Sequence, residues 1–251
     1  MKARPPLRKS EKRDLSMPER QILVSGANRG IGAAIATELA AAGLCVVGLT
    51  RSGTSAAGTA VACDVSDDGA IARAIGTVAE QGSIAGLVNN AGLYETHPSA
   101  QLAAADFERI MRVNATSMVV AARCVYPHLQ RAGGGLIVNI GSYYDKLGVA
   151  KTVAYCASKA AVGAITRCLA VEWAADNIRV VNVAPGYIAT ELNAEFRARD
   201  ATQRWIKQRI PAGRAGTPVE IGRLVAMLFT SNVSYLTGET IYVDGGLGMN
   251  H

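Results

Sequence analysis

Short apolar runs alternate with longer amphipathic segments along most of the chain. Seven such runs stand out, at 21–24, 44–49, 60–63, 86–88, 136–140, 178–184 and 241–243. Continuous apolar runs of this length, without alternating polar positions, are typical of strands buried on both faces. The segments between most of them are long enough for helices, which join parallel strands by right-handed crossovers. The pattern therefore predicts an α/β fold with a parallel, doubly wound sheet.

Residues typical of helix termini indicate where several helices begin or end. An Ala-rich segment runs to Ala42 and is closed by Gly43, a common helix terminator. We expect a long helix from about 105 to 130 and another over 157–172. Thr217 and Pro218 are suited to the N-cap and first turn of a further helix.

Composition and charge narrow the class of protein. The chain has 251 residues, 49% of them hydrophobic, which suits one domain over 21–251. No apolar run is long enough to span a bilayer. Residues 1–20 hold seven basic against three acidic residues, and so four of the six net positive charges. We therefore expect a disordered basic tail over 1–20, with Met17 a possible alternative start, and neither nucleic-acid nor membrane binding.

The five cysteines are scattered, without metal-ligand spacing to a histidine. His97 and His128 have no acidic partner within reach in the sequence, so we expect no metal. Free cysteines used as small core residues are typical of a reducing compartment, which predicts a cytoplasmic protein.

A glycine-rich turn joins the first apolar run to the first helix. Its glycines are Gly26, Gly30 and Gly32. Glycines there let the backbone turn tightly and approach a pyrophosphate, which the following helix N-terminus stabilises. The order strand, glycine turn, helix therefore predicts a dinucleotide site.

The end of the second run bears on which dinucleotide is bound. NAD sites usually place an acid there, whereas an arginine accommodates the 2′-phosphate of NADP. This chain has Arg51 and Ser52, with Arg29 as a second cation in the glycine turn. We expect NADP(H), with NAD(H) possible. Asp64, after the third run, could accept a hydrogen bond from the adenine or cap the next helix.

The stretch after the fifth run carries the candidate chemistry. Tyr155 and Lys159 are four residues apart and so share a helix face. An ammonium beside a phenol lowers the phenol pKa, which would make Tyr155 a usable proton donor. Ser142 leaves the strand end and could point toward the same place.

Taken together, these motifs resemble those of the short-chain dehydrogenase/reductase family, over about 21–248. The similar segments are Ser25–Gly32 (with Ser25 for the usual threonine), Asn89–Gly92, Asn114, the trio Ser142, Tyr155 and Lys159, Pro185–Gly186 with Thr190, Leu236–Glu239 and Val243–Gly246. Each is modest alone, but their number and order are specific.

The resemblance implies a seven-stranded sheet and roles for single residues. Tyr155 is the general acid/base, and Lys159 holds the nicotinamide ribose and lowers the tyrosine pKa. Ser142 binds the substrate oxygen, and Asn114 helps hold a water that relays protons to Lys159; the alternative for Asn114 is a bond to its own helix backbone. The expected cofactor-binding residues are Gly26, Asn28, Arg29, Gly30, Ile31, Gly32, Arg51, Ser52, Asp64, Val65, Asn90, Ala91, Gly92, Tyr155, Lys159, Pro185, Gly186, Ile188 and Thr190.

The sequence carries weaker signals for substrate-binding residues than for cofactor-binding ones. We expect Ser142, Tyr144, Tyr187 and Leu192 to contact substrate. The polar segment 190–210 resembles the family's lid, with Leu192, Phe196, Trp205 and Ile206 as its inner face.

The function expected first is an NADP(H)-linked carbonyl reductase or alcohol dehydrogenase acting on a small molecule. A β-ketoacyl-carrier-protein reductase comes second, because the catalytic helix ends near Asp176, where an acidic carrier would need a base, although Arg131 or the lid arginines could serve. A non-catalytic dinucleotide sensor comes last, because Ser142, Tyr155 and Lys159 are all present.

The resemblance also implies a homotetramer. Apolar residues in excess of one buried face, among them Val119, Val120 and 161–165, add support to it.

Overall fold

Seven parallel strands form one sheet in the part of the chain that the computed structural model describes, residues 20–231 and 233–249. Their order is β3-β2-β1-β4-β5-β6-β7. The strands are β1 (Gln21–Ser25), β2 (Cys45–Thr50), β3 (Thr59–Ala62), β4 (Ile84–Asn89), β5 (Gly135–Ile140), β6 (Ile178–Pro185) and β7 (Thr240–Val243). The predicted Rossmann-type α/β fold is thus confirmed. The predicted tail, apart from Arg20, lies outside the described residues.

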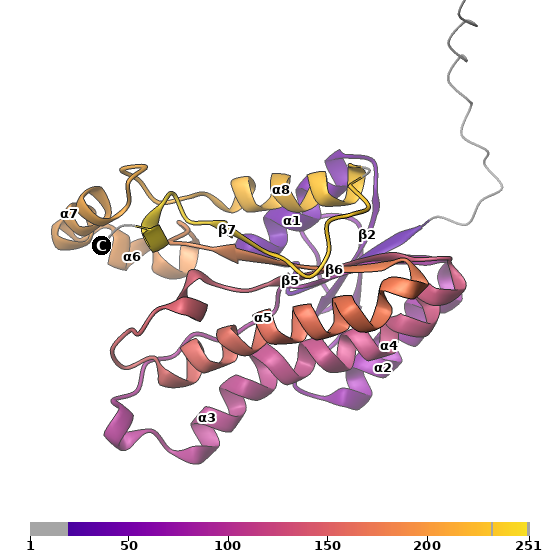
Figure 1. The fold of residues 1–251 in the computed structure, drawn as a ribbon, viewed down its shortest axis with the longest axis horizontal. Coiled ribbons are helices and arrows are strands. Elements are labelled where there is room, and N and C mark those ends of the chain that lie inside the picture. Colours follow the sequence, from indigo (N-terminus) through magenta and orange to yellow (C-terminus); the bar gives the residue numbers. More distant parts are fainter. Residues whose placement is uncertain (1–19, 232, 250–251) are drawn as a thin grey trace, which may run out of the picture.

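Helices cover both faces of the sheet (Figure 1). One face carries α1 (Gly30–Ala41) and α8 (Pro218–Thr230). The other carries α2 (Asp68–Gln81), α4 (Ser117–Arg131) and α5 (Val153–Trp173). Each layer buries its own apolar cluster: Ile35 and Ile221 in one, Ile71 and Val125 in the other. This two-sided burial explains why the central strands are continuous apolar runs.

The predicted helix over 105–130 is divided. It consists of α3 (Ala104–Met111), one π-helical turn (Arg112–Thr116) and α4. The helix predicted over 157–172 also starts earlier, at Val153, so Tyr155 lies in its first turn. Neither boundary is marked by glycine or proline, which is why the sequence pattern missed both.

Two predicted helix ends are confirmed and one is corrected. Gly43 adopts φ +78° after α1, and the Thr217 and Glu220 side chains form a capping box at α8. Asp64, however, does not cap α2: its carboxylate accepts bonds from the Ser66 backbone and hydroxyl, at 2.9 and 2.8 Å. The N-cap is Asp67, whose carboxylate accepts the backbone N–H groups of residues 69 and 70.

Because all strands are parallel, their carboxyl ends share one edge of the sheet. The loops that follow β1, β4, β5 and β6 meet there, beside the segment predicted as a lid (Figure 1). That segment forms a 3₁₀ turn (Glu191–Asn193), α6 (Ala194–Arg197) and α7 (Asp200–Arg209). Further 3₁₀ turns are Ser99–Gln101, Tyr143–Lys146, Ala174–Asp176 and Leu247–Met249.

The predicted inner face of the lid is only partly right. Ile206 is buried, but Phe196 and Trp205 are 50% and 39% exposed. The Leu192 side chain lies outside the described part of the structure. The second buried lid anchor is Ile210, at 2% exposure. None of the described helices has both the length and the apolarity to cross a membrane.

Candidate active site

The glycine turn is held by the end of the neighbouring strand β4. Asn90 Nδ2 donates to the Ser25 carbonyl oxygen at 2.9 Å, and Ser25 Oγ accepts the backbone N–H groups of Asn90 and Ala91 at 2.9 and 3.0 Å. A Cβ at Gly32 would lie 2.1 Å from the Gly26 carbonyl oxygen, so only glycine fits there. The Asn90 side chain therefore shapes the turn.

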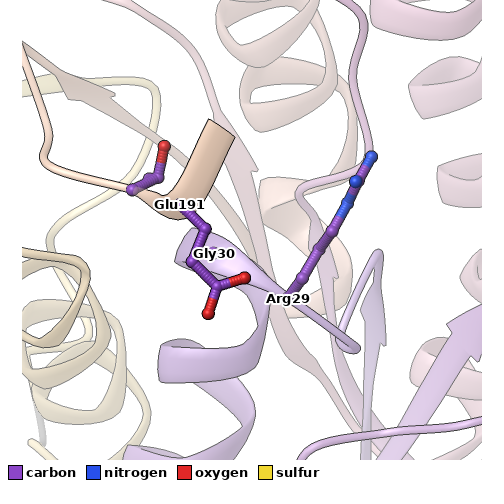
Figure 2. A pocket seen from close by; sticks show the side chains of 4 residues that line it. Arg29, Gly30 and Glu191 are labelled. Carbon is purple, nitrogen blue, oxygen red and sulfur yellow. The ribbon is translucent and has the colours of Figure 1, made fainter. Parts of the chain in front are cut away.

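The N-terminus of α1 faces a hollow of about 340 Å³, lined by Asn28, Arg29, Gly30, Ala33, Ala189, Thr190, Glu191 and Pro218. Helix α1 has no side-chain cap and no acid in its first turn. Its first N–H groups and Arg29 therefore fit the pyrophosphate of a dinucleotide. In Figure 2, Arg29 and Glu191 flank Gly30, and the Arg29 guanidinium points away from the Glu191 carboxylate. Glu191 is the lining group that fits a phosphate least.

The side chains expected at the adenosine end lie at the tips of β2 and β3. Arg51 and Ser52 are exposed after β2, where Thr50 Oγ1 organises the turn by donating to the Thr54 carbonyl at 2.8 Å. The positive charge of Arg51 contributes to the lowered pKa of Asp64, after the hydrogen bonds from Ser66. Arg51 thus lies near Asp64 and remains accessible to an anion. Val65 is half-buried beside them.

The candidate catalytic side chains come together at the carboxyl end of β5. Ser142 Oγ accepts the Tyr144 N–H at 3.2 Å and also hydrogen-bonds Tyr155. Lys159 Nζ lies 5.8 Å from the centre of the Tyr155 ring and donates to the Ile140 carbonyl oxygen at 2.8 Å. Tyr155 and Lys159 follow Ser142 by 13 and 17 positions. They are brought beside it because α5 packs along the strand.

Burial sets the protonation of this trio. It lowers the pKa of the Lys159 ammonium to about 8. It raises the pKa of Tyr155 to about 12, against a smaller lowering by the Ser142 hydrogen bond. The expected lowering of the Tyr155 pKa is therefore wrong for this structure, because loss of solvation dominates and Lys159 is not among the groups that shift this pKa. Tyr155 is a neutral phenol at physiological pH.

Asn114 lies in the π-helical turn and is fully buried. Its Oδ1 accepts the Leu93 N–H at 2.7 Å, and its Nδ2 donates to the Leu93 carbonyl at 2.9 Å and to Ser158 Oγ at 3.0 Å. Ser158 Oγ in turn donates to the carbonyl of Tyr155 at 2.7 Å. The amide thus ties the loop after β4 to α5, and the alternative of a bond to its own helix backbone is wrong. The proton relay stays a prediction.

The loop after β6 reaches from the sheet to the glycine turn. A Cβ at Gly186 would lie 2.5 Å from Asp244 Cα, so the Pro185–Gly186 turn packs closely on the end of β7. Ile188 is buried and forms a β-bridge with Gly216. Thr190 Cγ2 lies 3.8 Å from the position of a Cβ on Gly30. Ile31, on the other side of the turn, is half-buried.

Gly92 lies close to the side chains of Lys159 and Asn114. A Cβ there would lie 3.8 Å from Lys159 Nζ and 3.3 Å from Asn114 Oδ1. The structure thus brings the predicted Gly92, Asn114 and Lys159 together, and a side chain at position 92 would crowd Asn114 Oδ1 and touch Lys159 Nζ.

The sequence interpretation missed Tyr94. Its ring centre lies 4.9 Å from that of Tyr155, nearly perpendicular, and the predicted substrate residue Tyr144 lies 5.7 Å from Tyr155. An aromatic residue two positions after Gly92 was the available signal. Tyr187 packs against Trp205 of the lid, at 5.7 Å between ring centres, and its contact with substrate stays a prediction.

His97 does have an acidic partner, contrary to expectation: its Nε2 lies 3.3 Å from Glu95. Glu95, His97 and Asp106 form a group that could surround a cation. Arg109 already occupies that role, since its guanidinium donates to both carboxylates at 2.7–2.8 Å. The group is therefore best described as an ion-pair network.

The sheet order, the glycine turn and the Ser142, Tyr155 and Lys159 arrangement define a short-chain dehydrogenase/reductase. A family model described as "Enoyl-(Acyl carrier protein) reductase" matches residues 26–248. The chain belongs to the short-chain dehydrogenase/reductase family and is an oxidoreductase of the kind that acts on C–OH and C=O groups.

Its relatives differ in substrate. The 3-oxoacyl-[acyl-carrier-protein] reductase MabA of Mycobacterium tuberculosis is 38% identical over 92% of this chain and 94% of its own. A protein from Sinorhizobium meliloti 1021, described as a short-chain alcohol dehydrogenase, is 35% identical with a TM-score of 0.88, over 92% and 97% of the two chains. A Burkholderia cenocepacia gluconate 5-dehydrogenase, solved with NADP and tartrate, is 32% identical with a TM-score of 0.85, over 92% and 96%.

Proposed function

We propose that the chain is an NADP(H)-dependent carbonyl reductase of small molecules, with Tyr155 as general acid. The observation that carries this is the placement of Tyr155 at the carboxyl end of β5 with the buried Ser142 and Lys159, whose Nζ lies 5.8 Å from the Tyr155 ring centre. A phenol whose pKa is raised to about 12 holds its proton near pH 7. It can still protonate an alkoxide, which is the stronger base. This protonation state favours reduction over alcohol oxidation.

The residues then have distinct roles. When bound, the reduced nicotinamide supplies a hydride to the carbonyl carbon. Ser142 donates a hydrogen bond to the carbonyl oxygen, and the Tyr155 phenol gives that oxygen a proton as the C=O electron pair moves onto it. The phenolate is then reprotonated from the side of Lys159, whose ammonium has its pKa lowered to about 8 and so releases a proton readily. Asn114 holds the loop and the catalytic helix in register for this transfer.

Preference for NADP(H) over NAD(H) rests on the adenosine end of the site. Arg51 and Ser52 are exposed after β2 and Arg29 is exposed at the glycine turn. Two guanidinium groups attract a 2′-phosphate, and the end of β2 offers no carboxylate for a ribose hydroxyl. The relative from Burkholderia cenocepacia carries NADP in its solved structure.

A β-ketoacyl-carrier-protein reductase is the second candidate, favoured by the similarity to MabA. The end of the catalytic helix argues against it. There Asp176 accepts hydrogen bonds from Tyr126 and Gln130, at 2.8 and 3.1 Å, and so presents an acid where an acidic carrier would dock. A non-catalytic sensor is disfavoured because the whole catalytic trio is present and assembled.

One experiment separates these functions. Reduction of free ketones and of an acetoacetyl group, free and carrier-bound, would be followed by absorbance with NADPH and with NADH. We expect free ketones to be reduced, with NADPH preferred. A kcat/KM at least about tenfold higher for the carrier-bound group would favour the second candidate. Cofactor binding without reduction of any carbonyl would favour the sensor.

A further inference from the structure

Two aromatic rings from distant segments pack beside the reacting phenol. Tyr94 follows β4 and Tyr144 follows β5, and both rings stand nearly perpendicular to that of Tyr155, at 4.9 and 5.7 Å. The Tyr94 ring also packs edge-on against that of Tyr144, with the ring centres 6.3 Å apart, so two ring contacts hold Tyr94 in place. Tyr94 is nevertheless 55% exposed. A fixed, half-exposed ring next to the catalytic group offers a flat surface to a substrate.

The same wall continues under the lid. Tyr144 and Tyr187 both pack on an apolar cluster that contains Ile206 and Ile210 of the lid segment. Trp205 contacts Tyr187 edge-on and is 39% exposed. The rings thus extend from Tyr155 toward α7, which sits at the open end of the sheet (Figure 1).

The charged side chains beside this wall already have partners: Asp145 accepts a hydrogen bond from Tyr242 at 2.9 Å, and Lys146 Nζ lies 3.7 Å from the centre of the Tyr242 ring. The side chains that chiefly shift the pKa of Tyr155 are those of Ser142, Tyr144 and Cys156, and none of the three carries a full charge at pH 7. Arg197 acts on Tyr187 from the lid, and its Nε donates to Asn193 Oδ1 at 2.9 Å. The Lys159 ammonium, 5.8 Å from the Tyr155 ring centre, already donates to the Ile140 carbonyl oxygen. A carboxylate next to the reacting carbon would therefore lose water and gain only a cation that is already engaged.

One polar group on the wall lacks a partner among the described residues. The Tyr187 hydroxyl is buried and makes no hydrogen bond there. A buried hydroxyl without a partner is unfavourable, and a bound acceptor would relieve it. Tyr187 is linked to Tyr94 through Tyr144, which packs on the same apolar cluster as Tyr187 and against the Tyr94 ring.

We propose that the substrate is a planar, ring-bearing ketone, uncharged near the reacting carbon, with its ring on Tyr94 and a further acceptor atom facing Tyr187. This inference rests on the proposed carbonyl-reductase function. It sets the protein apart from the relative solved with tartrate, an open-chain hydroxy acid.

The test compares four ketones with NADPH: 1-tetralone, 6-methoxy-1-tetralone, 2-octanone and 5-keto-D-gluconate. We expect kcat/KM for the tetralones to exceed the two open-chain ketones by at least about tenfold, and the methoxy group to raise it further. Tyr94→Ala should lower kcat/KM for 1-tetralone by about tenfold and that for 2-octanone by less than about threefold. Tyr94→Phe, which keeps the ring, should retain most of the preference. Tyr187→Phe should remove the advantage of the methoxy group alone.

Several outcomes would overturn the inference. A wild-type preference for 2-octanone or 5-keto-D-gluconate would do so while leaving the reductase function standing. Equal effects of Tyr94→Ala on all ketones would also contradict it. NADPH fluorescence and melting temperature, measured on each variant, separate a damaged fold from a changed preference. Failure of the wild-type protein to bind NADPH would overturn the proposed function itself.

Discussion

The Lys159 ammonium donates a hydrogen bond to the Ile140 carbonyl oxygen at 2.8 Å, at the end of β5 and just before Ser142. The lysine is 4% exposed. One backbone carbonyl replaces little of the water that an ammonium loses on burial, so the pKa of Lys159 falls to about 8. The pairing fixes the position of the cation at a cost in stability.

That cost should depend on pH. The unfolded chain keeps the Lys159 proton up to its ordinary pKa of 10.5, whereas the folded chain releases it near 8. At pH 7 both states are protonated and the burial penalty is complete. Between pH 8 and 10.5 the unfolded state binds more protons, so stability contributed by this site rises with pH.

The measurement is the free energy of unfolding in urea for the wild type and Lys159→Met at pH 7, 8.5 and 10. The wild type should gain roughly 2–3 kcal/mol relative to the variant over this range. Other titrating groups cancel in the difference between the two proteins. A difference that stays constant with pH would show that Lys159 keeps an ordinary pKa.

Tyr155→Phe should lower kcat by at least about a thousandfold, because the ring packing remains but the transferable proton is lost. NADPH affinity, measured by fluorescence, should change by less than about threefold. Tyr126→Phe is a suitable control, since its hydroxyl bonds Asp176 at the far end of α5. If the Tyr155→Phe variant kept half the wild-type kcat, Tyr155 would not be the proton donor.

Arg51→Asp should shift the ratio of kcat/KM for NADPH and NADH toward NADH by about 10–100-fold. A charge-assisted hydrogen bond to the 2′-phosphate is lost, and the new carboxylate repels it. Arg20→Asp makes the same charge change at the opposite, amino end of β1 and should leave the ratio unaltered. A wild type that already prefers NADH would contradict the roles given to Arg29 and Arg51.

Asn114→Ala tests a structural role for a residue expected to serve a proton relay. The alanine leaves the half-buried N–H and carbonyl of Leu93 without their side-chain partner. It also removes the bond to Ser158 and leaves a cavity at a fully buried position, so we expect a loss of roughly 2–4 kcal/mol in the free energy of unfolding. Urea denaturation gives this value. Unchanged stability with lowered kcat would instead favour the relay as the main role.

The sheet and the catalytic trio could be predicted because their signals are local. A strand buried on both faces is an apolar run, so each predicted strand lies within about two residues of the observed one. Ser142, Tyr155 and Lys159 lie within one strand–loop–helix unit, and the glycine turn has its own spacing. These features need no knowledge of long-range packing.

Long-range contacts could not be predicted in the same way. The pairing of Asn114 with Leu93 spans 21 residues and depends on a π-helical turn without a glycine or proline to mark it. The packing of Tyr94 on Tyr155 joins loops after different strands. The raised pKa of Tyr155 also depends on tertiary burial, which the spacing to Lys159 does not reveal.

The predicted homotetramer now rests on a smaller set of residues. Val120 and Val162, which looked like surplus apolar positions, are buried in the core, and Val119 and Val171 are 40% and 82% exposed. Val119 lies on α4 and Val171 on α5, in the same helical layer (Figure 1). Exposed valines on the outer side of a packed layer are suited to an isologous contact with a second copy.

Light scattering at micromolar concentration tests this assembly. The wild type should show the mass of four chains, and the Val119→Glu/Val171→Glu double variant the mass of one or two, because the carboxylates would be buried without partners. Phe196→Glu, an equally large change at an exposed lid residue, should keep the wild-type mass. A wild type that is monomeric and active would show that the valines on α4 and α5 form no interface.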